Sequence, residues 1–385
     1  MYTTAYTKDT HSTCFLLNDN SEHYVIDGQE LTSDYIWTLN QEEREALIEK
    51  VIDYQYSQGF PYKELLTKCY DDTYIMEQLI KLAKYKSSKV LTSEGFISNS
   101  GSLCLDVCRF MNKDMFWKAK GDTNSRSTEE VFYNRELLRE VLKNRMGWCL
   151  TTERGYEEPY IFDIGPAMII QGIRSSRTGY TVSNFRPTIA KFIYEKYVPV
   201  GGSVFDYSCG WGARMLAATS LGLEYYGTDP LTTNNIQNFV NKYLPHSKVT
   251  LIKSGSEKSE AYTNIPKVDM CMSCPPYFTL ERYSDDATQC YVENANYNTW
   301  LQEYWKSTVD NCLSILKDDG HFVLIIKDSY GKMNLKDDMC KIIEEQGLKL
   351  IDTYQYKTTR DHLTGKRKTG VVSKNSEYIL VYKKC

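Results

Sequence analysis

The sequence predicts an α/β protein with a seven-stranded, Rossmann-like domain in its second half and a mostly α-helical domain before it. From about residue 176, short apolar runs alternate with segments of helical periodicity, which is typical of a parallel sheet covered on both faces. Before about residue 170 the periodicity is mainly helical. At 385 residues the chain is long enough for two domains. We therefore place them at residues 1–170 and 176–385, with the boundary in the glycine-containing stretch Gly172–Gly179.

The amino-terminal domain is expected to begin with a short hairpin over residues 14–27, with the turn at Asn18-Asp19-Asn20. Three amphipathic helices follow, from Asn40 to Gly59, from about Thr73 to Lys86, and from Thr128 to Arg145. Asn40 is a good helix cap because its side chain accepts a hydrogen bond from a backbone N–H in the first turn. No chemical motif stands out here, so the domain's role is open between assembly and substrate recognition.

The elements of the second domain alternate along the chain. Strands are expected at residues 203–207, 225–229, 249–252, 267–274 and 320–327, with a closing pair at 348–357 and 377–383. Helices are expected to end before Pro199 and to cover residues 213–221, 232–243, 301–316 and 335–346.

The first strand ends in a glycine-rich turn, Asp206-Tyr-Ser-Cys-Gly-Trp-Gly-Ala-Arg214. Gly210 and Gly212 allow this turn to approach a ligand closely, and the helix that follows begins with unpaired backbone N–H groups. The turn lacks both the Gly-x-Gly-x-x-Gly pattern and the phosphate-loop lysine, so a nucleotide phosphate is not its expected ligand.

Three further features follow the next three strands. Asp229, before Pro230, is placed to accept hydrogen bonds from ribose hydroxyls. The loop Lys253-Ser-Gly-Ser-Glu257 is placed at the edge of an adenine. The fourth strand stops at Cys274-Pro-Pro-Tyr277, where two prolines stiffen a turn that presents a thiol, a carbonyl and an aromatic ring.

These four features in this order resemble the class I S-adenosylmethionine-dependent methyltransferases, and more narrowly those that act on exocyclic amino groups of DNA bases, N6 of adenine or N4 of cytosine. The resemblance covers roughly Thr178 to Lys384. It includes Tyr180-Thr-Val-Ser-Asn-Phe-Arg-Pro187, where the family has a segment that touches the methionine end of the cofactor. Residues 1–165 have no comparable match.

The resemblance implies S-adenosyl-L-methionine as cofactor and assigns roles to individual residues. Tyr277 would stack on the target base after that base leaves the duplex, since an aromatic platform returns about 1–3 kcal/mol of the unstacking cost. The implied cofactor-binding residues are Asn184, Phe185, Asp206, Ser208, Gly210 and Gly212 toward the methionine part, Asp229 and Pro230 at the ribose, and Ser256 or Glu257 at the adenine.

The sequence departs from the family at Cys274, because the family's Pro-Pro-aromatic turn begins with Asp, Asn or Ser. In the family, that side chain and the carbonyl of the first proline, here Pro275 before Pro276, accept both N–H bonds of the target amino group. A thiol is a weak acceptor. Three explanations stay open. Cys274, or Ser273 by a local shift, suffices; Cys274 is a nucleophile for cytosine carbon-5 chemistry; or else a different residue is the acceptor, or the domain binds without methylating.

The formal net charge is −4, so nucleic-acid binding requires a local basic patch. Such a segment lies between the two closing strands, with Lys357, Arg360, Lys366, Arg367 and Lys368 against one acid, Asp361. Its alternatives are a phosphate-binding loop and an ordinary solvated hairpin. Aromatic residues after the Pro-Pro turn are candidates for a base pocket or for packing: Tyr283, Tyr291, Tyr297 and Trp300.

Composition excludes several classes. The chain has no apolar run of the roughly 20 residues that a membrane helix requires, and its first residues lack the apolar core of a signal peptide, so an intracellular, cytoplasmic location is expected. The 12 cysteines are dispersed in mostly apolar contexts, as reduced thiols are, and no histidine stands at ligand spacing, so we expect no metal site.

We therefore expect an S-adenosylmethionine-dependent DNA methyltransferase that acts on adenine N6 or cytosine N4, with DNA as its partner. The alternatives are an RNA base methyltransferase, a cytosine carbon-5 transferase, and a catalytically silent methyltransferase fold that serves as a nucleic-acid-binding or assembly module.

Overall fold

The computed structural model describes residues 23–60, 71–98, 101–121, 126–147, 162–175, 182–280, 282–328, 333–356 and 377–384. The chain divides into two compact units. The first comprises residues 1–74 and 113–182, and the second, which we call the catalytic unit, comprises residues 75–112 and 183–385. Residues 75–112 thus group with the α/β half, whereas the sequence places them in an amino-terminal domain that ends at residue 170.

The first unit is mostly helical, as expected. A two-strand hairpin turns at Asp27-Gly28, a dipeptide that readily adopts the left-handed backbone of a tight turn; here φ is 53° and 79°. The predicted turn at residues 18–20 lies outside the described residues. The elements are β1 (Val25–Ile26), β2 (Gln29–Glu30), α1 (Ser33–Thr38), α2 (Gln41–Gln58), α6 (Lys113–Phe116), α7 (Thr128–Phe132), α8 (Arg135–Arg145) and α9 (Pro166–Ser175).

Helix caps decide two of the boundaries in this unit. Asn40 caps α2 in a reciprocal arrangement with Glu43, which confirms the predicted start. The prediction of a single helix from Thr128 to Arg145 is wrong, because helix α7 ends before Tyr133 and a second helix, α8, begins at Arg135. The Asn134 side chain accepts a hydrogen bond from the backbone N–H of Leu137 and so caps the start of a second helix. The hydrophobic periodicity alone indicates a single continuous helix.

A seven-stranded sheet forms the centre of the catalytic unit and confirms the predicted fold class. Its order is β5-β4-β3-β6-β7-β9-β8, with β9 antiparallel to both of its neighbours and the other described pairings parallel. The strands are β3 (Ser203–Asp206), β4 (Glu224–Thr228), β5 (Val249–Ile252), β6 (Val268–Ser273), β7 (Leu316–Lys327), β8 (Lys349–Gln355) and β9 (Glu377–Lys383).

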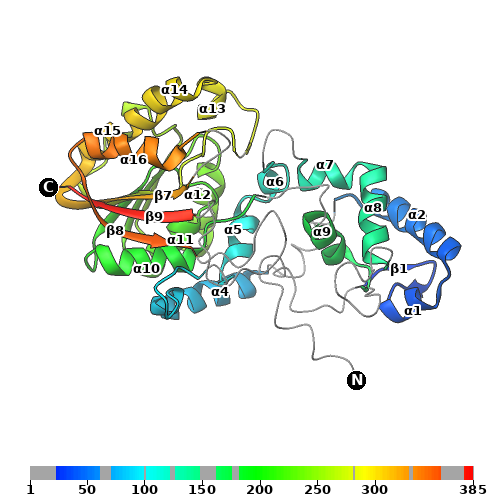
Figure 1. Ribbon diagram of the computed structural model, residues 1–385. Coiled ribbons are helices and arrows are strands. Elements are labelled where there is room, and N and C mark those ends of the chain that lie inside the picture. The colour runs from blue at the N-terminus through cyan, green and yellow to red at the C-terminus, as the bar shows by residue number, and fades with distance from the viewer. Residues whose placement is uncertain are drawn as a thin grey trace. The chain divides into compact units, whose positions relative to one another are not determined.

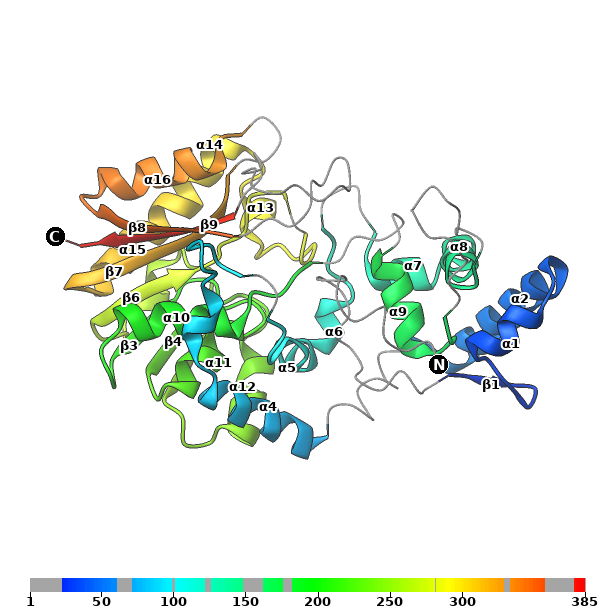
Figure 2. The same ribbon diagram turned by 60° about the horizontal axis from the view of Figure 1, so that its bottom comes forward.

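Helices cover both faces of this sheet, with α10 and α11 on one face and α14 and α16 on the other (Figures 1 and 2). The predicted helix over residues 301–316 begins as a π-helical turn, η4, before it becomes α15. The helical elements are α10 (Pro187–Tyr197), α11 (Ala213–Ser220), α12 (Thr233–Tyr243), η3 (Ser259–Tyr262), α13 (Cys290–Glu293), α14 (Tyr297–Thr299), η4 (Trp300–Lys306), α15 (Ser307–Ile315) and α16 (Leu335–Glu345).

A buried lysine is one link between residues 75–112 and the rest of the catalytic unit. This segment contains most of α4 (Asp72–Lys84), η1 (Ser87–Val90) and α5 (Leu105–Met111). Lys191 of α10 is 2% exposed, and its ammonium group donates to the carbonyls of Leu82 and Ala83 at the end of α4. A cation at a helix carboxyl end satisfies orphan carbonyls and complements the helix dipole. Sequence periodicity gives no sign of this contact.

Candidate active site

The chain order of the strands reverses between β3 and β6, which are neighbours in the sheet although β4 and β5 separate them in sequence. In open α/β sheets, ligands bind at such a switch point, outside the carboxyl ends of the strands. The glycine turn follows β3, and the Cys-Pro-Pro-Tyr turn follows β6. Topology thus brings together the two motifs that the sequence suggests for cofactor and base.

The Asp206 side chain connects the two turns through hydrogen bonds. Its side chain is fully buried and accepts hydrogen bonds from the Arg214 Nε, the Tyr225 hydroxyl and the Ser273 hydroxyl, each at 2.8 Å. The backbone N–H of Ser208 adds a fourth at 3.2 Å. With its oxygens occupied in this way, Asp206 fixes the glycine turn against β4 and β6, and we propose that it shapes the cofactor site through the backbone.

Arg214 completes a buried ion pair with Asp206 and is 4% exposed. Burial disfavours its charge, but the Asp206 carboxylate outweighs that effect and raises the pKa of Arg214 above its ordinary value. The guanidinium also donates to the carbonyl of Ser208 and lies over the Phe185 ring, 5.4 Å from its centroid. This residue was missed in the sequence, where it reads as an ordinary helix residue after the glycines.

The two glycines of the turn have different roles. Gly210 has φ of 49°, and its N–H donates to Asp229 Oδ2 at 3.2 Å. A Cβ added there would meet only the Ser208 carbonyl, at 3.8 Å, so its surroundings stay open. Gly212 has φ of 84°, and an added Cβ would lie 2.9 Å from the Met111 Cε of α5. Gly210 therefore supplies open space and Gly212 supplies close packing.

We expect Gly212→Ala to destabilise the catalytic unit more than Gly222→Ala does. Both glycines have positive φ, which costs an L-residue about 1–2 kcal/mol. An alanine Cβ at Gly222 would meet nothing within 4 Å, whereas at Gly212 it would meet Met111. Urea unfolding of the two variants measures the difference, which Met111→Ala should reduce. Equal losses for the two glycines would contradict the packing role.

Asp229 lies at the end of β4, as predicted, and is half-buried. Its Oδ1 accepts from the N–H groups of Leu231 and Thr232, both at 2.9 Å, beyond Pro230. Burial raises the pKa of Asp229, while these backbone hydrogen bonds act in the opposite direction. The carboxylate therefore holds the loop between β4 and α12 and also sits beside Gly210, where a ribose is expected.

Of the two candidates after β5, the side chain of Ser256 is committed elsewhere. Its hydroxyl lies 2.8 Å from that of Thr308 on α15, and the residue is 3% exposed. Glu257 is half-buried with its carboxylate 3.5 Å from the Lys258 Nζ, and burial raises its pKa. The adenine role that the sequence leaves open between them is thus better suited to Glu257 than to the Ser256 hydroxyl.

Helix α5 borders the site and was missed in the sequence. The Asn184 Nδ2 donates to the Leu105 carbonyl at 3.1 Å, and the Asn112 Nδ2 donates to the Trp211 carbonyl at 3.2 Å. Asn184 is 4% exposed, yet its Oδ1 has no hydrogen-bond partner in the described part of the chain. A buried acceptor without a donor is costly, so this amide oxygen is a natural place for a ligand donor.

The Cys-Pro-Pro-Tyr turn ends β6 as predicted. Cys274 is half-buried, and its Sγ lies 3.0 Å from the Tyr277 hydroxyl. That hydroxyl donates to Glu377 Oε1 of β9 at 3.0 Å, and the Tyr277 side chain is largely buried. Phe278 has φ of 55°, which is strained for a non-glycine residue, and its ring packs against Trp300. Stacking of Tyr277 on a base stays a prediction.

Ser273 does not serve as a substitute acceptor in this structure. Its hydroxyl is fully buried and donates to Asp206 Oδ1 at 2.8 Å, and the Ser208 carbonyl oxygen, at 3.0 Å, is the alternative acceptor for the same proton. The Cys274 Sγ contacts a different group, the Tyr277 hydroxyl. The explanation that relies on a local shift of Ser273 is therefore disfavoured by the geometry.

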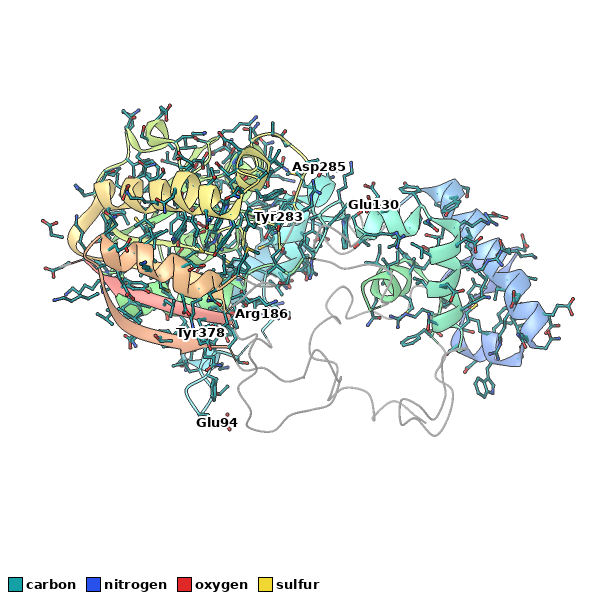
Figure 3. All side chains as sticks on the ribbon, turned by 45° about the horizontal axis from the view of Figure 1, so that its top comes forward. Glu94, Glu130, Arg186, Tyr283, Asp285 and Tyr378 are labelled. Carbon is teal, nitrogen blue, oxygen red and sulfur yellow. The ribbon has the colours of Figure 1, made fainter. Side chains whose placement is uncertain are left out.

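One of the four aromatic candidates lies beside the glycine turn. Tyr283 is half-buried and packs edge-on against Trp211, with ring centroids 6.0 Å apart. Figure 3 shows Tyr283 and Arg186 on the same side of the catalytic unit. Trp300 is fully buried in the core, and Tyr297 packs on it. The predicted phosphate-binding residues Lys357, Arg360, Lys366, Arg367 and Lys368 lie outside the described residues.

Residues 268–385, which include the Pro-Pro turn and the last three strands, match the family model described as DNA methylase. The match confirms the resemblance to DNA amino-methyltransferases over that part of the chain. Together with the sheet topology, it decides the class of enzyme. The protein is a methyltransferase. Its cofactor is S-adenosyl-L-methionine. No curated protein matches this methyltransferase.

Solved structures show weaker similarity. TrmN from Thermus thermophilus is 16% identical, with 52% of this chain and 49% of that chain covered and a TM-score of 0.35. A SAM-dependent O-methyltransferase from Thermotoga maritima is 16% identical, with 53% and 68% covered and a TM-score of 0.35. The chain thus spans about half the length of TrmN. The assignment rests on topology and on the family match, not on these similarities.

The described residues fit the cofactor in three respects. The unpartnered Asn184 Oδ1 suits the ammonium group of the methionine part. The open surroundings of Gly210 suit close approach to the backbone. The half-buried Asp229 carboxylate suits ribose hydroxyls. Within the described ranges, no cluster of three His, Cys, Asp or Glu side chains has metal-site geometry, and no helix there is long and apolar enough to cross a membrane.

Proposed function

We propose that this methyltransferase transfers a methyl group to an exocyclic amino nitrogen in DNA, N6 of adenine or N4 of cytosine. One observation carries the proposal: the Cys-Pro-Pro-Tyr turn lies across the switch point from the glycine turn, with Ser273 bonded to Asp206 between them. The family match, described as DNA methylase, includes that same turn. Methyl donor and base acceptor would thus meet at one edge of the sheet.

An exocyclic amino group is a poor nucleophile because its lone pair is delocalised into the ring. In the proposed reaction, the Pro275 carbonyl and the Cys274 sulfur accept its two N–H bonds and direct the lone pair toward the cofactor. Asn184 and Asp229 hold the cofactor at its ammonium and ribose groups. When bound, S-adenosyl-L-methionine supplies the electrophilic methyl group, and the amino nitrogen that takes it up releases one of its two protons to water. Orientation at close range supplies much of the rate, so the weak thiol acceptor is tolerated.

Other parts of the chain carry the finer proposals. The amino-terminal region of residues 1–170 would contribute recognition of the nucleic acid, and the basic residues between Lys357 and Lys374 would contact phosphates. Removing a contact to phosphate should lower the salt dependence of nucleic-acid binding and leave the preferred base sequence unchanged.

The test is mass spectrometry of nucleosides from DNA and from RNA incubated with the protein and methyl-labelled cofactor. Label on adenine N6 or cytosine N4 of DNA supports the proposal. Label confined to RNA, label on cytosine carbon-5, or cofactor binding without label on either polymer would overturn it. Asp206→Asn provides the inactive control, because Asp206 anchors the turns on both sides of the site.

Asp229→Asn is expected to weaken binding of S-adenosyl-L-methionine about tenfold, the equivalent of one charged hydrogen bond. Asparagine keeps one oxygen for the N–H groups of Leu231 and Thr232, so the loop should stay folded. Isothermal titration calorimetry measures the affinity. Asp318→Asn, at an exposed carboxylate near the start of β7, is the matched control and should bind like the parent. Equal affinities of all three proteins for S-adenosyl-L-methionine would show that Asp229 does not bind the cofactor.

A further inference from the structure

The Tyr277 hydroxyl stands between a thiol and a carboxylate. It lies 3.0 Å from Cys274 Sγ, 3.0 Å from Glu377 Oε1 and 3.4 Å from the Ile325 carbonyl. A hydroxyl has one proton to donate, and a carboxylate is a stronger acceptor than a thiol or a neutral carbonyl. The proton therefore points to Glu377, and the oxygen lone pairs are left facing the sulfur of Cys274.

Glu377 is held in place by its strand. It is the first residue of β9, pairs with Lys327 of β7, and accepts the Tyr356 N–H at its carbonyl at 3.0 Å. Burial raises the pKa of Glu377, whereas the hydrogen bond from Tyr277 and the charges of Lys327 and Arg186 lower it. The phenol of Tyr356, which follows β8, also faces this carboxylate, since burial and then the Glu377 charge raise the pKa of Tyr356.

We infer that Glu377 is a positioning residue for the proposed amino-methylation. By accepting the Tyr277 proton, Glu377 turns the hydroxyl oxygen toward Cys274, which can then direct its S–H at that oxygen. In this orientation the Tyr277 hydroxyl does not donate to the sulfur, and the sulfur can accept the N–H of the target base. This inference rests on the proposed function, and it explains how a thiol serves where the family has an oxygen acceptor.

The arrangement depends on the charge of Glu377. Once protonated, Glu377 no longer holds the Tyr277 proton as firmly, so the hydroxyl can donate to sulfur and occupy the lone pair that the base requires. Activity should therefore be retained above the pKa of Glu377 and lost as pH falls through it. Because burial raises that pKa, the loss should occur at higher pH than for an exposed glutamate.

The experiment compares kcat against pH for the full-length parent, Glu377→Gln, Tyr277→Phe and the double variant. Glu377→Gln keeps the shape but does not titrate. We expect it to lose the acidic limb and to lower kcat roughly tenfold at high pH, the equivalent of one hydrogen bond. In the Tyr277→Phe background, Glu377→Gln should change nothing further, because the link to Cys274 is already gone. Glu377→Asp should restore an acidic limb.

The inference would be overturned if the Glu377→Gln variant kept the loss of kcat at low pH, or if the effects of Glu377→Gln and Tyr277→Phe on kcat were additive in the double variant. Measurements of thermal unfolding and cofactor affinity distinguish a folding defect from a loss of catalysis. The matched control is Glu345→Gln, at an exposed position of α16. If Glu377→Gln does not fold, the Glu377→Asp profile decides, since it must keep the limb. Failure of the parent to methylate an amino nitrogen would refute the proposed function instead.

Discussion

Arg214→Met is expected to destabilise the catalytic unit by about 3–5 kcal/mol, the range for breaking a buried ion pair. The substitution keeps the length of the side chain but leaves the fully buried Asp206 without its charged partner. It also removes the donor to the Ser208 carbonyl and the cation over the Phe185 ring. The free energy of unfolding in urea, extrapolated to zero denaturant, measures the loss.

Two controls identify the cause of that loss. Lys248→Met removes an exposed partner of Glu224 and should leave the unfolding midpoint unchanged, since exposed pairs contribute little. Asp206→Leu with Arg214→Met removes both charges and should be less destabilising than the sum of the single variants. Additive losses would mean that the two residues stabilise the unit independently, and the ion pair would not be the anchor of the site.

Cys274→Ala is expected to lower kcat about 10²-fold, as does loss of one preorganised polar contact at a reacting group. Only the sulfur acceptor is removed, and Cys274 is half-buried in a turn that two prolines keep in place. Cofactor affinity should therefore not change. Single-turnover transfer of labelled methyl to DNA measures the chemical step, and calorimetry checks the cofactor.

Cys274→Ser restores an acceptor and should be at least as active as the parent, because a hydroxyl is a better acceptor than a thiol. Cys340→Ala of α16, a half-buried thiol away from the sheet switch point, is the matched control and should retain full activity. Full activity of Cys274→Ala would exclude the sulfur as an acceptor. Label on cytosine carbon-5 that disappears in Cys274→Ser would make Cys274 a nucleophile.

The sequence by itself determined the elements whose causes are local. Strands β5 and β9 have the predicted bounds, and α2 begins at its Asn40 cap. The two strand-end turns also follow from local chemistry, since glycine permits positive φ and proline ends a ladder. A helix break that depends on one cap, as at Asn134, is too weak a signal to override a continuous periodicity.

Only the tertiary structure decided which of these side chains meet. Asp206 is bonded to Ser273 and Tyr277 to Glu377 across 67 and 100 positions of sequence, and Lys191 binds the end of a helix 109 positions earlier. The physical reason is that a buried polar group must find a partner wherever the fold provides one, and no local pattern records that choice. The motifs at the strand ends thus point to methyl transfer, but it is the packing of β3, β6 and β9 that arranges the acceptors around Cys274.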